Sequence, residues 1–60
     1  MTLPQMITQG STADFELTNG YRFEAVVVEN ERNRHILKLL VGNIRPAVIG
    51  YEQVRTATIH

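Results

Sequence analysis

The feature that most constrains this chain is an Asn-Gly pair with alternating apolar and polar residues on both sides. In Thr12–Leu17, before the pair, every second residue is apolar, which is the period of a half-buried β-strand. The same alternation resumes over residues 21–27. Asn-Gly between two such runs is the strongest short-range signal for a β-hairpin. The sequence therefore predicts two antiparallel strands joined by a tight turn at Asn19-Gly20.

The register of this hairpin follows from the need to keep one face apolar. A two-residue loop would place apolar residues opposite charged ones and mix the two faces. A three-residue loop that ends in a left-handed Gly20 instead pairs Phe15 with Phe23 and Ala13 with Ala25. Because a buried face selects register strongly, we predict the three-residue loop.

The rest of the chain holds three more segments with strand character and no internal repeat. They follow a polar break at residues 29–34 and are separated by turn signals at Gly42-Asn43 and residues 50–53; they lie at residues 35–41, 44–51 and 54–59.

These segments complete a chain of five short strands. Pro46 indicates an edge strand or a strand start, because proline cannot donate to a sheet ladder. The valines at 26–28 are apolar on both faces, which suits a bent strand in a closed barrel. We predict an all-β domain over residues 12–60, a small and strongly bent antiparallel barrel of the SH3-like kind. Residues 1–11 fit either an extended arm or a single helical turn. The exposed edges of such a barrel invite pairing with a neighbour.

Composition limits how so small a domain can be stabilised. A chain of 60 residues buries only about 60% of the surface that its unfolded form exposes, so it usually needs a disulfide, a metal or a partner. The chain has no cysteine, and His35 and His60 are too few to predict a zinc site, so we expect no metal and no cofactor. Oligomerisation is the remaining way to stabilise the domain. With no cysteine, signal-like start or long apolar run, the expected location is the cytoplasm.

The residue types argue against catalysis. Ser11 and Asp14 are the only serine and aspartate, and no Gly-rich phosphate loop is present. We therefore predict a binding protein and no enzyme. Net charge is zero, which weighs against nucleic-acid binding by overall basicity, but five of the six cations are arginines. Arginine can stack on bases and fork onto phosphates.

At this point the chain resembles the Sm/LSm/Hfq family. The stretch FELTNGYRFEAVVV is similar to the first Sm motif, HILKLL to the third strand, and VIGYEQVRTATI to the second motif. The matching positions of the first motif are Phe15, Leu17, Gly20, Phe23, Ala25 and Val27. The chain departs from the family at Ala25, where glycine is general, and at residues 50–53, where the family has Arg-Gly or Lys-His. The family's N-terminal helix is missing or reduced to a turn. The shortness of the chain fits a divergent member from a phage or another mobile element.

The resemblance implies a homo-oligomeric ring of five to eight copies, with a pentamer to heptamer favoured, in which the fourth strand of one subunit pairs with the fifth of the next. It also implies that single-stranded RNA, rich in U or A, binds near the pore as part of RNA metabolism or riboregulation. Two loops would face this RNA. The implied RNA-binding residues are Asn30, Arg32, Asn33, Arg34, His35, Tyr51 and Gln53.

Plainer interpretations remain open. The polar loop at residues 30–35 is also what a solvated hairpin loop looks like, and Tyr51 and Gln53 fit an ordinary tight turn. Tyr21 and Phe23 are expected in the core rather than as base platforms. At the level of function, an SH3-like protein-interaction or structural module without nucleic acid is the main alternative. A swapped dimer of the carbon-storage-regulator type is another, although its basic opening is absent.

Overall fold

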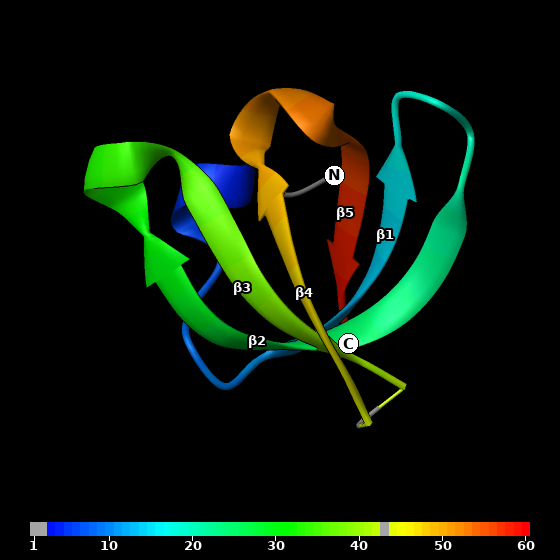
Figure 1. Ribbon diagram of the computed structural model, residues 1–60, viewed down its shortest axis with the longest axis horizontal. Helices are drawn as coiled ribbons and strands as arrows, with labels where there is room; N and C mark the ends of the chain where they lie inside the picture. The colour runs from blue at the N-terminus through cyan, green and yellow to red at the C-terminus, as the bar shows by residue number, and fades with distance from the viewer. Residues whose placement is uncertain (1–2, 43) are drawn as a thin grey trace.

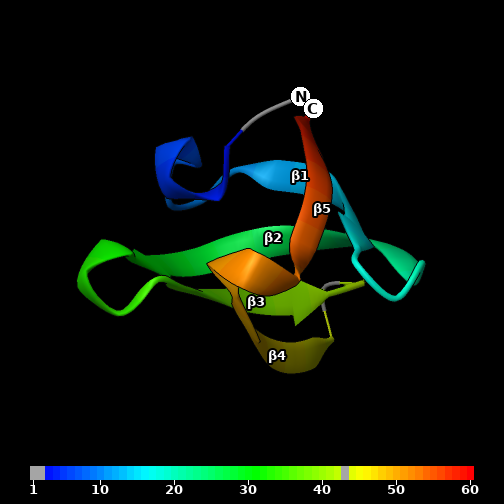
Figure 2. The same ribbon diagram turned by 90° about the horizontal axis from the view of Figure 1, so that it is seen from above.

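In a computed structural model, which describes residues 3–42 and 44–60, the chain has the predicted all-β fold. Among these residues, five antiparallel strands form one sheet in the order β4-β3-β2-β1-β5. The sheet is strongly bent and curls into a small barrel-like fold (Figures 1 and 2). The strand bounds are β1 Thr12–Leu17, β2 Arg22–Glu31, β3 Ile36–Val41, β4 Arg45–Gly50 and β5 Val54–Ile59.

The β1–β2 hairpin has the predicted register. Phe15 pairs with Phe23 and Ala13 with Ala25, so apolar residues face each other across the two strands. The loop closes through a hydrogen bond from the Gly20 N–H to the Leu17 carbonyl (2.9 Å), and Gly20 has a φ of +89°. The expected left-handed glycine is therefore confirmed.

The second strand extends further than the sequence indicates. Residues 29–31, expected in a polar loop, belong to β2 and pair with β3, Asn30 opposite Leu37. A bulge between Val27 and Glu29 shifts the register there. Such a bulge bends a strand and increases its twist. Because β3 continues to supply backbone partners beyond the bulge, polar side chains do not end β2.

The edges of the sheet are β4 and β5. Pro46 lies in β4 opposite Leu40, which confirms the predicted edge strand. The last strand β5 pairs with β1, Phe15 opposite Ala57. The Asn43 half of the expected Gly42-Asn43 turn lies outside the described residues.

The core fills the inside of the bend. Its largest buried side chains come from each of the central strands and from the N-terminal arm; they are Phe15, Ile7, Leu37, Leu39 and Val27. Ile7 is 1% exposed, so the arm contributes to the core of the barrel. Phe23 packs against this cluster as expected, but Tyr21 is 57% exposed, and its expected place in the core was wrong. Tyr21 lies just before β2, where the hairpin loop leaves the sheet, and its ring covers that of Phe23 from outside (centroids 5.5 Å apart).

Short 3-10 turns connect the strands. They are η1 Pro4–Met6 in the arm, η2 Arg32–Arg34 between β2 and β3, and η3 Tyr51–Gln53 between β4 and β5. The arm thus holds a single turn, and residues 1–2 of it lie outside the described part. In that part, no helix has the length and the apolar character that crossing a membrane requires.

Candidate functional site

The η2 and η3 turns bring two aromatic rings together that are distant in the sequence. The Tyr51 N–H donates to the His35 carbonyl (2.8 Å), which fixes one turn against the other. Their rings stack with centroids 5.4 Å apart and an interplanar angle of 24°. His35 is exposed and Tyr51 half-buried. The structure therefore joins one predicted site residue from each loop into a stacked ring pair.

Asn30 holds this region together from β2. Its side-chain amide donates to the carbonyls of Pro4 (3.1 Å) and Ile7 (2.8 Å), and its side-chain oxygen accepts from the Tyr51 hydroxyl. Both N–H groups and the oxygen are thus engaged within the chain. Asn30 positions the arm and the Tyr51 ring, and it does not present a free edge to a base.

The arginines of η2 come just before His35 in the chain, and both are exposed. The Arg32 Nε donates to the Gln5 carbonyl (2.7 Å), and the Arg32 side chain is held against the N-terminal arm by this bond. Arg34 lies 3.5 Å from Glu31, and its side chain is 70% exposed. Asn33, between them, is exposed. Residues 29–34 line an open hollow of about 560 Å³.

Gln53 closes the η3 turn. Its side-chain oxygen accepts from the Gly50 N–H (2.8 Å), and its backbone carbonyl accepts from the Thr18 N–H (2.9 Å). These bonds tie the turn to β4 and to the hairpin loop. Gln53 therefore shapes the turn that carries Tyr51. Its side-chain N–H groups can donate hydrogen bonds to a ligand.

Acidic groups limit the positive charge beside the hollow. Lys38 lies 3.0 Å from Glu31 and 3.5 Å from Glu29. The hydrogen bond from the Lys38 ammonium holds the pKa of Glu31 below its usual value, and the same bond raises the pKa of Lys38. Both groups are charged at neutral pH. The region is therefore close to neutral, with exposed guanidinium groups at its rim.

Chemically, this end of the sheet offers a stacking surface and charged donors. A flat ring pair can extend its stack onto an unpaired base, and guanidinium groups can contact phosphate. The sequence alone missed the role of the arm, whose backbone carbonyls at Pro4, Gln5 and Ile7 hold Asn30 and Arg32 in place. Backbone acceptors leave no residue-type signal, so no motif could have revealed it.

The similarity of the chain to the Sm/LSm/Hfq family rests on its sequence motifs alone. No protein-family model, curated protein or solved structure matches the chain.

Proposed function

We propose that this chain is a non-enzymatic binding protein that takes up single-stranded RNA at the stacked pair of His35 and Tyr51. The observation that carries the proposal is this ring pair, exposed on its His35 side and close in sequence to the exposed Arg32 and Arg34. Base stacking on aromatic side chains contributes about 1–3 kcal/mol per base and is available only to unpaired bases. Single-stranded RNA therefore fits the pair better than a duplex does.

The proposed working form is a homo-oligomeric ring. The strands β4 and β5 lie at opposite ends of the strand order, so β4 of one copy can extend the sheet of the next copy at its β5. A head-to-tail contact of this kind closes into a ring when its rotation allows. We propose a pentamer to heptamer. Closure would gather one ring pair and one set of arginines from each subunit, in the manner that the family resemblance implies.

Zero net charge sets the expected character of the binding. Few phosphates can be neutralised, so the salt dependence should be shallow and the affinity modest. Stacking rather than phosphate contact should supply most of the free energy. We propose a preference for U- or A-rich runs and a role in RNA metabolism or riboregulation.

Fluorescence anisotropy with labelled oligo-U and oligo-A at low salt tests the proposal. His35→Ala should weaken binding about tenfold or more, because it removes the exposed ring of the pair. His35→Tyr keeps an aromatic ring at the same position and should restore most of the affinity. His60→Ala is the matched control, since it removes the other histidine of the chain and should leave RNA affinity unchanged.

Absence of binding up to about 100 μM protein, equivalent to less than about 5.5 kcal/mol, would overturn the RNA proposal. Equal losses in His35→Ala and His60→Ala would overturn the assignment to the ring pair. Circular dichroism spectra of each variant should match that of the parent, so that a loss of affinity reports on the site.

A second candidate, a protein-interaction module without nucleic acid, is favoured by one separate observation. An open apolar hollow of about 450 Å³ lies over β2, β3 and β4, and its walls include Val28, Leu40, Pro46 and Val48. Val28 is 50% and Val48 61% exposed. Exposed apolar surface of this kind is typical of protein contacts. This candidate predicts no RNA binding in the same anisotropy experiment.

A further inference from the structure

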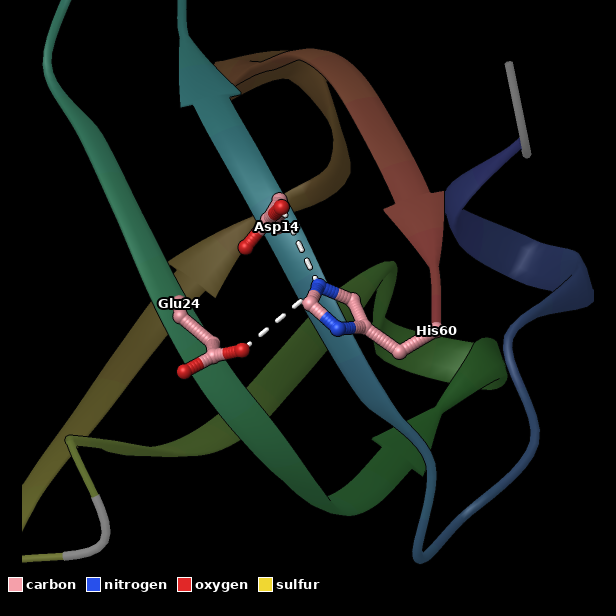
Figure 3. Close-up of side chains that lie close together, drawn as sticks. All are labelled: Asp14, Glu24 and His60. Atoms are coloured by element: carbon pink, nitrogen blue, oxygen red, sulfur yellow. Dashed lines mark ion pairs between the residues drawn. The ribbon is translucent and has the colours of Figure 1, made fainter.

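Three side chains that can ligate a metal converge on the outer face of the sheet, away from the ring pair. Asp14 comes from β1, Glu24 from β2, and His60 directly follows β5. Figure 3 shows the imidazole of His60 lying between the two carboxylates. Its Nε2 is 3.0 Å from the Asp14 Oδ2 and 3.5 Å from the Glu24 Oε2. One ligand atom from each residue lies within 4.8 Å of the others.

Strand register accounts for this convergence. Asp14 and Glu24 are direct cross-strand partners, and Asp14 also pairs with Thr58 of β5. Side chains two residues apart on a strand share a face, so His60 emerges on the same face as Thr58. The His60 N–H donates to the Thr12 carbonyl (3.0 Å), which continues the β1–β5 ladder to this residue. Backbone pairing therefore brings the three side chains together.

The carboxylates of Asp14 and Glu24 favour a cation between them, because both carry negative charge. Like charges directly opposite each other in an antiparallel pair destabilise the sheet. A divalent ion held by all three groups would offset this repulsion. The repulsion is thus a cost to the apo sheet that a bound ion would relieve.

We propose that Asp14, Glu24 and His60 bind a divalent first-row transition metal, with Zn²⁺ as the reference ion. One imidazole nitrogen and two carboxylate oxygens are a ligand set that suits Zn²⁺ and disfavours Mg²⁺, which prefers oxygen alone. In a tetrahedral zinc site with bonds of about 2.0–2.1 Å, ligand atoms lie about 3.3 Å apart. The distances from the His60 Nε2 to the two carboxylate oxygens, 3.0 and 3.5 Å, lie on either side of this value.

The surroundings leave room for a fourth ligand from solvent. The three residues are exposed, and an open hollow of about 450 Å³ on this face is lined by Asp14, Glu24 and Thr58 among others. Arg22, a cation that lines the same hollow, lies 3.7 Å from Glu16 and so has a carboxylate of its own. Water can complete the coordination. The site differs from the proposed RNA site in every residue, so either proposal can fail without the other.

Isothermal titration calorimetry of the tag-free chain with ZnCl₂ near neutral pH tests the proposal. We expect one Zn²⁺ per chain with a dissociation constant below about 100 μM, and at least tenfold weaker binding of Mg²⁺. His60→Gln and Asp14→Asn should each weaken Zn²⁺ binding at least about tenfold, because each removes one of three ligands. His35→Gln is the matched control and should bind Zn²⁺ like the parent.

Three results would overturn the metal site. The first is no Zn²⁺ binding up to about 100 μM, which would leave only the contacts of His60 with the two carboxylates. The second is unchanged binding in His60→Gln, and the third is loss of binding in His35→Gln. A nuclear magnetic resonance titration provides a second readout on the folded parent chain: Zn²⁺ should shift the ring signals of His60 and leave those of His35 in place.

Discussion

At the scale of single residues, Gly20 is needed for its backbone conformation and not because space for a side chain is lacking. Its φ of +89° is one that side-chain-bearing residues rarely adopt, yet a Cβ built there meets no atom within 4 Å. The cost of substitution is therefore one of backbone strain. Gly20→Val should lower the free energy of unfolding by at least about 1 kcal/mol. Chemical denaturation measures this, with Gly20→Asn as the control.

Asparagine tolerates left-handed backbone better than a β-branched residue does. Gly20→Asn should therefore lose clearly less stability than Gly20→Val. Equal losses in the two variants would show that the strain lies elsewhere than in the φ of this residue.

Glu31 and Lys38 form the ion pair whose protonation should be visible in stability. Lys38 lowers the pKa of Glu31 from the ordinary 4.5, so the folded chain binds this proton less readily than the unfolded chain. The pair therefore stabilises fully above that value, and its contribution is lost as the pH falls through the lowered pKa. Lys38→Gln should reduce the drop in melting temperature between about pH 6 and about pH 3.

The control for this experiment is Arg45→Gln, which removes one positive charge from the neighbouring strand β4. It should leave the pH-dependent drop in melting temperature close to that of the parent. An identical drop in all three proteins would show that the pair contributes nothing measurable.

At the scale of elements, Asn30 links β2, the N-terminal arm and the η3 turn. Asn30→Ala deletes its hydrogen bonds to the arm and leaves the half-buried Tyr51 hydroxyl without its acceptor. We expect a loss of about 1–3 kcal/mol in the free energy of unfolding. Asn33→Ala, three residues along and exposed, should change it by less than about 0.5 kcal/mol. Thermal unfolding compares the two, and similar losses would contradict the linking role of Asn30.

The same elements show what the sequence could and could not predict. The β1–β2 hairpin was predictable to the residue. Apolar residues, Phe15 and Phe23 among them, alternate with polar ones on both sides of the loop, and Gly20 marks the turn. The end of β2 was not predictable, because residues 29–31 are polar and have the composition of a loop. The bulge and the pairing with β3 depend on residues distant in the sequence. The contact of Asn30 with Pro4 spans 26 residues and involves a backbone carbonyl. Periodicity carries no information on such a contact.

The Asp14–Glu24 pair was implicit in the predicted register, since these residues lie between Ala13–Ala25 and Phe15–Phe23. His60 was not, because its place depends on the pairing of β5 with β1, which no local pattern specifies. The proposed metal ligands could not be predicted, because the sequence does not reveal the long-range pairing of β5 with β1. The meeting of His35 with Tyr51 in a stack depends likewise on how η2 and η3 approach each other.

At the scale of the whole molecule, stability should depend on assembly. The chain is small, and exposed apolar side chains, Ile44 (78% exposed) and Val48 among them, lie beside or within the edge strand β4. Light scattering at micromolar concentration should give the mass of five to seven chains, and the melting temperature should rise with protein concentration. A monomer or a dimer under these conditions would contradict the ring.

The η3 turn bears on the symmetry that such an assembly can adopt. It joins β4 directly to β5 and is held from both sides, by Gln53 at the hairpin loop and by Tyr51 at His35. We infer that this turn constrains the angle between the two edge strands of one subunit. Each subunit of a closed ring must turn the next by about 72° in a pentamer and about 51° in a heptamer. In the proposed ring, the number of copies would then depend on this three-residue turn, and a ligand that contacts Tyr51 would act on the same angle.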